Sequence, residues 1–253
     1  GEGFADALSA APLAKKYNAP ILLTGKDTLD SNTKSELQSL GVKNVFLIGG
    51  TGSISNNVKS ELESMNIAVT KISGKDRFET SLEVAKNLGD INGIVVTNAY
   101  GFADALSIAP IAASQNMAII LTLPDSLPSD TQTFLSSINY DKSYIVGGTG
   151  VVSDTVNSQL KNVTRLSGAS RYETNAAVAN ELVKNNGIKA DNVIIVSGEG
   201  FSDALSAAPI AAVKGEILLL SANSIESIRP AADFIKSNKP NVTVIGTKNV
   251  INN

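Results

Sequence analysis

Residues 3–9, Gly-Phe-Ala-Asp-Ala-Leu-Ser, decide the fold because the chain repeats them. The same seven residues recur at 101–107, and at 200–206 with a single change, serine for alanine at position 202. From Gly3 to Gly101 is 98 residues, and from Gly101 to Gly200 is 99. A seven-residue motif that recurs at a nearly constant spacing indicates a tandem array of three structural units.

Composition excludes several classes of protein. The net charge is −3 and arginine occurs four times, so no basic surface for nucleic acid is expected. No run of eighteen apolar residues is present, so membrane insertion is not expected. Cysteine and histidine are both absent, which excludes disulfides, thiolate catalysis, the common zinc sites and a Ser-His-Asp triad. We expect no catalytic residue, no metal and no cofactor.

The three copies share one pattern of secondary structure. Short β-branched and apolar runs predict buried strands. They lie at residues 94–97, 117–121 and 144–146 in the middle copy, at 21–23 and 45–48 in the first, and at 193–196, 217–220 and 242–245 in the third. An alanine-rich helix follows each Gly-Phe motif, and Pro110 is predicted to kink or break it. Strands alternating with helices predict an α/β fold with parallel sheets.

A second motif, Ser-Gly-x-x-Arg-aromatic-Glu-Thr, joins the copies at 73–80 and 167–174 and opens a helix each time. No such motif precedes Gly3 and none follows the third copy. We therefore expect a first unit without its head, a complete second unit and a third unit without its tail, as in a piece of a longer protein. The expected units are residues 1–71, 72–164 and 165–253.

The recurring loops are predicted to lie at one edge of each sheet. In a parallel sheet the carboxyl ends of the strands meet at one edge, where ligands of such folds bind. The Gly-Gly-Thr-Gly loops at 49–52 and 147–150 have two interpretations. They could hold a phosphate on backbone amides, or they could be tight turns, which we favour because the lysine of a P-loop is missing.

Arginine and aspartate occur once each in the motifs of a complete unit. Arg77 with Asp104, and Arg171 with Asp203, could be an acid–base pair or contacts to a ligand. We favour structural ion pairs, because a partly buried arginine needs a carboxylate. Asp6 would then have no partner.

These motifs together resemble the cell wall binding repeat 2 family of clostridial surface-layer proteins and some secreted Gram-positive hydrolases. The resemblance covers essentially the whole chain. It implies three Rossmann- or Toprim-like units packed about a pseudo-threefold axis. It also implies noncovalent attachment to the wall through an anionic wall polymer, with enzymatic or adhesive activity in accessory domains.

The family's Pro-Ile-Leu-Leu motif is implicated in polymer binding and is complete only at residues 20–23. The second copy reads Ala118-Ile119-Ile120-Leu121, and the third aligns as Glu216-Ile217-Leu218-Leu219. Such a run is also what a buried strand requires. The expected polymer-binding residues are Pro20, Ile21, Leu22, Leu23, Thr24, Lys26, Ile119, Ile120, Leu121, Thr122, Ile217, Leu218, Leu219 and Ser221.

Three hypotheses on function remain open. The first is a secreted anchoring module of the cell wall or surface layer that binds an anionic polysaccharide. The second is a structural lattice protein that contacts surface-layer neighbours, and the third is an enzyme acting on a phosphorylated sugar or nucleotide. We favour the first, with Lys26, Lys75, Lys142 and backbone amides as the positive groups at the strand ends.

Overall fold

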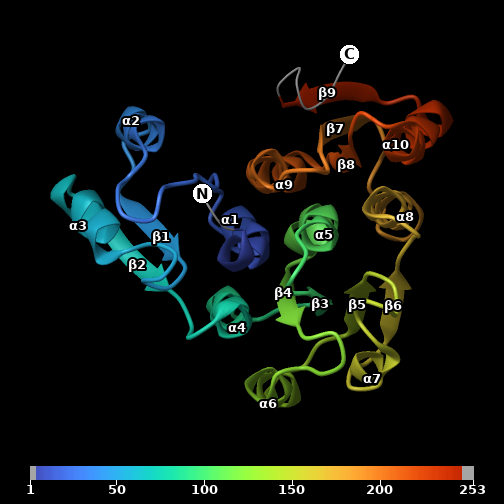
Figure 1. The fold of residues 1–253 in the computed structure, drawn as a ribbon, viewed down its shortest axis with the longest axis horizontal. Coiled ribbons are helices and arrows are strands. Elements are labelled where there is room, and N and C mark those ends of the chain that lie inside the picture. Colours follow the sequence, from blue (N-terminus) through green and yellow to red (C-terminus); the bar gives the residue numbers. More distant parts are fainter. Residues whose placement is uncertain (1–3, 247–253) are drawn as a thin grey trace.

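The structure is a computed structural model that describes residues 4–246. The chain forms three α/β units that follow the three Gly-Phe motifs (Figure 1). The first unit holds η1 (Ala5–Ser9), α1 (Ala11–Lys16), α2 (Ser31–Ser39), β1 (Asn44–Ile48), α3 (Asn56–Ser64) and β2 (Ala68–Ile72). The middle unit holds α4 (Arg77–Leu88), β3 (Gly93–Asn98), α5 (Ala103–Ser114), β4 (Met117–Thr122), α6 (Ser129–Ser137), β5 (Lys142–Val146), α7 (Asp154–Asn157) and β6 (Val163–Leu166). The third unit holds α8 (Arg171–Asn185), β7 (Asn192–Ser197), α9 (Ser202–Lys214), β8 (Ile217–Ser221), α10 (Ile225–Asn238) and β9 (Asn241–Ile245).

Each unit has its own sheet, and every strand pairing is parallel. The strand orders are β1-β2, β4-β3-β5-β6 and β8-β7-β9. The prediction of three separate parallel α/β units is confirmed. The boundary expected between residues 164 and 165 falls inside β6, which pairs with β5 of the middle sheet. We propose that the units are better divided after Ile72 and after Leu166.

The three alanine-rich helices meet at the centre of the molecule. Helices α1, α5 and α9 lie side by side there (Figure 1). Leu8, Leu106 and Leu205 occupy equivalent positions in the motif and share one buried cluster. The rings of the three motif phenylalanines, Phe4, Phe102 and Phe201, lie 5.5, 5.6 and 6.2 Å apart between centroids. Equivalent residues that meet at one point define the expected pseudo-threefold axis.

Contrary to the prediction, Pro110 does not break its helix. Helix α5 runs without interruption from Ala103 to Ser114, and α9 likewise contains Pro209. A proline inside a helix costs about 3 kcal/mol. The burial of α5 between neighbouring helices outweighs that cost, since every residue from Ala105 to Ala113 is buried. In the first unit the helix does divide, and Pro12 lies in the first turn of α1, where no N–H is required.

The prediction of a strand at residues 21–23 is wrong: this segment has no assigned strand. Its counterpart in the middle unit, β4, pairs only with β3. Among the described residues, no strand of the first unit stands in the place of β3. Segment 21–23 therefore has an apolar sequence typical of a strand and no strand to pair with.

Candidate functional site

The repeated loops lie at the carboxyl ends of the strands, as predicted. Gly49 and Gly147 follow β1 and β5, and the Ser-Gly-x-x-Arg loops follow β2 and β6. The two kinds of loop are neighbours, because a Cβ atom built on Gly50 would lie 3.7 Å from the carbonyl oxygen of Gly74. Since the strands are parallel, each sheet has one edge at which these loops gather.

The glycine loops are shaped around the aspartate of the Gly-Phe motif. Gly49 and Gly147 have φ angles of 128° and 114°, which favour glycine. A Cβ on Gly49 would lie 3.0 Å from Asp6 Oδ2, and one on Gly147 would lie 2.9 Å from Asp104 Oδ2. A carboxylate thus occupies the space beside each loop. This arrangement favours the tight-turn interpretation over a phosphate site.

The Ser-Gly-x-x-Arg motif is a helix cap. Asp76 and Ser170 accept hydrogen bonds from the backbone N–H groups of Glu79 and Glu173, at 2.9 and 3.3 Å. The motif glutamates and threonines bond back to N–H groups of the loop in both copies, as in Gly74 N–H to Thr80 Oγ1 at 3.1 Å. These bonds satisfy backbone groups that a helix start leaves unpaired.

The predicted ion pairs do not form. Neither Arg77 with Asp104 nor Arg171 with Asp203 is within 4.0 Å among the described residues. Arg77 Nη1 instead donates to the carbonyl oxygen of Ala99 at 2.8 Å, and Arg171 Nη1 donates to that of Gly198 at 2.7 Å. Each guanidinium thus ties the start of its helix to the residue that follows the next strand, which the sequence pattern does not reveal.

Asp104 carries the most perturbed carboxyl group at this edge. Burial raises its pKa from 3.8 to about 6, and the charge of Arg171 opposes that rise. The arginine that acts on Asp104 therefore comes from the following unit. Asp6 occupies the equivalent position and accepts a hydrogen bond from Ser53 Oγ at 2.6 Å. Ser53 lies four residues after Gly49, and the residue four after Gly147 is Val151. Asp104 therefore has a valine where Asp6 has a serine hydroxyl.

The apolar runs of the middle and third units are buried. Ile119, Ile120, Leu121 and Thr122 in β4 are at most 1% exposed, and Ser221 at the end of β8 is 6% exposed. Ile217, Leu218 and Leu219 of β8 are likewise buried. These side chains form the sheet and offer no surface to a polymer. Among the predicted contacts of these two units, the strand residues are therefore excluded, and the loops beyond the strands stay a prediction.

The strand pairing also corrects the alignment of the third copy. Ala118 pairs with Ile94 in the middle sheet, and Ile217 pairs with Val193 in the third. Counting from the Gly-Phe motifs, Ala118 and Ile217 are equivalent as well. The third counterpart of Pro-Ile-Leu-Leu is therefore residues 217–220, one residue later than predicted. Glu216 lies outside it.

In the first unit, the apolar run at residues 21–23 lines a cleft. Residues 21–25 and α2 form one side of it, and the start of α9 forms the other. Its volume is about 500 Å³, and its lining residues are Ile21, Leu22, Leu23, Thr24, Gly25, Asp30, Thr33, Ser202, Asp203 and Ser206. We call it the first-unit cleft. It joins the first and third units and contains two carboxylates, so it does not favour an anion.

The three lysines that we predicted at the strand ends differ in their surroundings. Lys26 is exposed in the loop after residues 21–25. Lys75 lies in the loop after β2, with Glu79 at 3.8 Å and Asp130 at 3.6 Å. Lys142 is wrongly placed by the prediction, because it begins β5 and so lies at the opposite edge, 3.5 Å from Glu181.

Two buried polar residues that position the helices are not predicted by the sequence motifs. Ser81 and Asn175 immediately follow the Ser-Gly-x-x-Arg motifs and are buried. Ser81 Oγ accepts from Leu121 N–H at 3.1 Å, and Asn175 Oδ1 accepts from Leu220 N–H at 2.8 Å. Each joins a helix to the edge strand of its sheet. The available signal was a polar residue on the apolar face of a helix.

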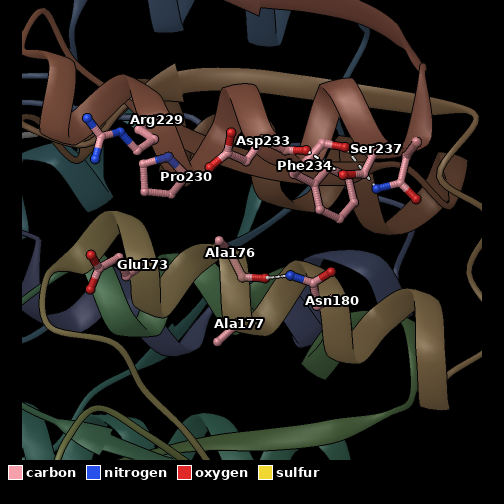
Figure 2. Close-up of a pocket in the computed structure, with 10 residues that line it drawn as sticks. Glu173, Ala176, Ala177, Asn180, Arg229, Pro230, Asp233, Phe234 and Ser237 are labelled. Atoms are coloured by element: carbon pink, nitrogen blue, oxygen red, sulfur yellow. Dashed lines mark hydrogen bonds between the residues drawn. The ribbon is translucent and has the colours of Figure 1, made fainter.

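A second groove, between α8 and α10, has a volume of about 420 Å³ (Figure 2). Asn180, Ser237 and Asn238 line it, but each hydrogen-bonds a carbonyl of its own helix. It lies between helices and contains none of the glycine loops. We do not assign it to the candidate site.

The sequence matches a known family over all three repeats. The family described as Cell wall binding domain 2 (CWB2) matches residues 1–59, 71–157 and 165–253. The chain belongs to this family. Similar proteins from Bacillus subtilis (strain 168) are N-acetylmuramoyl-L-alanine amidase LytC, 33% identical over 246 residues, and Amidase enhancer, 37% identical over 242 residues. The alignments cover 97% and 93% of this chain but only 49% and 32% of those proteins.

Two solved structures share the fold of this CWB2 chain. Cwp6 from Clostridium difficile has a TM-score of 0.87 and 33% identity, with 96% of this chain and 40% of Cwp6 covered. Cwp8 from the same organism has a TM-score of 0.82 and 31% identity, with 96% and 43% covered. These likenesses confirm the α/β fold with three tandem repeats, and the family match indicates association with the cell wall or surface.

Residues 4–246 contain no group of three or more acidic residues placed to hold a metal ion. None of their helices has the length and apolar character needed to cross a membrane.

Proposed function

We propose that this chain is a noncatalytic, secreted module that binds an anionic polysaccharide of the Gram-positive cell wall and so anchors a protein noncovalently. The observation that carries the proposal is the family match over all three repeats. The chain spans half or less of the relatives that share it, which include proteins named as an amidase and an amidase enhancer. Enzymatic activity of such proteins would then reside outside the region that matches this chain.

The contacts to the polymer are proposed at the strand-end loops. Lys26 is the best candidate cation, because Glu79 and Asp130 already lie near Lys75. The backbone of Gly25, Gly52 and Gly150 can add N–H donors, whereas the N–H groups of Gly49 and Gly147 already donate to the carbonyl oxygens of Ile72 and Leu166. The apolar runs of residues 20–23, 119–121 and 217–219 then act by holding these loops in place.

Three weak sites on one chain suit a long polymer. A net charge of −3 repels a polyanion mildly, so each site must rely on local groups. Sites that engage the same polymer strand can raise the overall affinity by about 10²–10⁴ over a single site. The pseudo-threefold arrangement displays three similar edges around one axis, which supports such multivalent binding.

The test is cosedimentation with purified cell walls, before and after chemical removal of the secondary polymer. Binding should require that polymer and should weaken in high salt. Lys26→Gln should lower the affinity by up to about fivefold, because one exposed charge contact contributes at most about 1 kcal/mol. Lys43→Gln, an exposed lysine at the amino end of β1, is the matched control. If stripped walls retain the protein equally well, the proposed ligand is wrong.

The lattice hypothesis makes a different prediction in the same assay. A module that only contacts surface-layer neighbours would not bind purified walls free of those proteins. Binding to such walls that depends on the polymer therefore separates the two functions.

A further inference from the structure

Tyr100 is an exposed aromatic side chain at the strand-end edge of the middle unit. It lies in the loop between β3 and α5, directly before the Gly-Phe motif, and is 60% exposed. Asn98 holds this loop in place, because its Oδ1 accepts from Tyr100 N–H and its Nδ2 donates to the carbonyl oxygen of Val151, both at 2.8 Å. Tyr100 therefore lies close to the Gly-Gly-Thr-Gly loop at residues 147–150.

The ring of Tyr100 is held by two neighbours from the start of α4. The centroid of the Phe78 ring lies 6.2 Å from that of Tyr100, and the two planes meet at 79°. The guanidinium carbon of Arg77 lies 5.6 Å from the Tyr100 centroid, within the range of a cation–π contact. A ring that is oriented before a ligand arrives loses less conformational entropy on binding. Tyr100 is thus both exposed and preorganised.

Arg77 is a half-buried cation without a carboxylate partner. Among the described residues, no carboxylate oxygen lies within 4.0 Å of its guanidinium. Its Nη1 donates to the carbonyl oxygen of Ala99 at 2.8 Å, which leaves the positive charge uncompensated. A guanidinium also has further N–H donors that suit carboxylate and phosphate groups. The edge of the middle unit therefore presents an aromatic ring and a cation side by side.

The third unit lacks this combination. The residue equivalent to Tyr100 is Glu199, which is also exposed. Arg171, the equivalent of Arg77, has its guanidinium carbon 5.2 Å from the ring centroid of Phe102 in the middle unit, and its charge acts on Asp104. A carboxylate in place of the ring repels an anionic ligand. Of these two units, only the middle one is suited to an anionic sugar.

We propose that Tyr100 and Arg77 form a sugar-binding platform that gives the middle unit a stronger polymer contact than the third. One sugar ring of the polysaccharide packs its C–H groups on the Tyr100 ring, whose π face carries partial negative charge. An anionic group of the same polymer lies against Arg77. The inference rests on the proposed function, and it adds the kind of contact and the unit that makes it.

A series of variants at position 100 tests the platform by cosedimentation with purified cell walls. Tyr100→Ala should lower the affinity about 3–10-fold, the size of a single aromatic packing contact, and Tyr100→Phe should keep most of it. Tyr100→Glu, which copies the third unit, should lose more than Tyr100→Ala, because a carboxylate repels a polyanion. Tyr17→Ala is the matched control, since Tyr17 is 51% exposed at the end of α1, at the opposite edge. Urea unfolding checks that each variant is folded.

Salt separates packing on the ring from attraction between charges. High salt should remove most of the effect of Lys26→Gln, because it screens exposed charges. The ratio of affinities between the wild type and Tyr100→Ala should stay the same, because packing on the ring does not depend on ionic strength. A ratio that falls to one in high salt would overturn the stacking contact.

A direct measurement uses the polymer released from the walls. In NMR spectra of protein labelled in its tyrosine rings, the signals of Tyr100, assigned with Tyr100→Phe, should shift when the polymer is added, and those of Tyr17 should not. If the wild type binds walls through the polymer but Tyr100→Ala binds equally well, or if the Tyr100 signals do not shift, the platform is overturned and the proposed function stands. If stripped walls retain the wild type equally well, the proposed function fails and the platform with it.

Discussion

Replacing the carboxyl group of Asp104 should stabilise the protein at neutral pH. Burial raises the pKa of Asp104 from 3.8 to about 6, despite the opposing charge of Arg171. At neutral pH the folded protein therefore holds a carboxylate that would be better solvated in the unfolded chain. This difference in pKa corresponds to about 3 kcal/mol, since each pKa unit is worth about 1.4 kcal/mol. Part of the gain is lost because an asparagine amide is also polar, so Asp104→Asn should add about 1–3 kcal/mol.

The sign of the pH dependence follows from proton binding. Between about pH 4 and pH 6 the folded state binds more protons at Asp104 than the unfolded state does, so stability falls as the pH rises through this window and is level above it. The gain from Asp104→Asn should thus be largest near pH 7.5 and small near pH 4. Urea unfolding at both pH values measures it.

A second variant tests the physical cause. Val151→Ser places a hydroxyl where Ser53 donates to Asp6, and it should lower the pKa of Asp104. Carboxyl NMR titration reads that pKa directly. Asp6→Asn is the control, because Asp6 already has its hydroxyl and should gain nothing. A loss of stability in Asp104→Asn, equal at the two pH values, would refute the reasoning.

Two further predictions concern the helix that opens at each Ser-Gly-x-x-Arg motif. Gly74→Ala should cost about 1–3 kcal/mol, because the new Cβ would lie 2.4 Å from Glu79 Cβ, whereas Gly148→Ala, with no atom within 4 Å, should cost far less. Asn175→Leu should cost about 2–4 kcal/mol, because it leaves Leu220 N–H and Leu218 O buried without their partner. Asn180→Ala on the exposed side of α8 is its control, and denaturant midpoints that show no difference within either pair would contradict these assignments.

Local sequence patterns predicted three of the four strands of the complete unit, but they missed β6 and predicted a break at Pro110 that does not occur. Apolar runs of strand length alternate with helical patterns, and both signals depend on residues close in the chain. The one misplaced strand, residues 21–23, shows the limit. Its sequence suits a buried strand, but a strand forms only where a neighbour accepts its hydrogen bonds, and that neighbour is not a local property.

The candidate site was predicted less well. Its edge was found, because strand direction and loop position follow from the βα order. The predicted pairing of Arg171 with Asp203 was wrong. When units pack around an axis, a side chain of one unit can lie nearer to the neighbouring unit than to its own, and Arg171 acts on Asp104 of the preceding unit. The apolar runs also could not be divided between core and ligand surface, since both require the same side chains.

The sequence alone determined the number of repeats, their parallel α/β class and the loops that share an edge. It could do so because a seven-residue identity at one period is independent of how the units pack. Only the tertiary structure decided that Phe4, Phe102 and Phe201 meet on one axis, that Arg171 acts on Asp104, and that residues 21–25 line a cleft with the start of α9. These contacts join residues far apart in the chain, from 67 positions (Asp104 to Arg171) to 197 (Phe4 to Phe201), and their geometry depends on the packing of whole units.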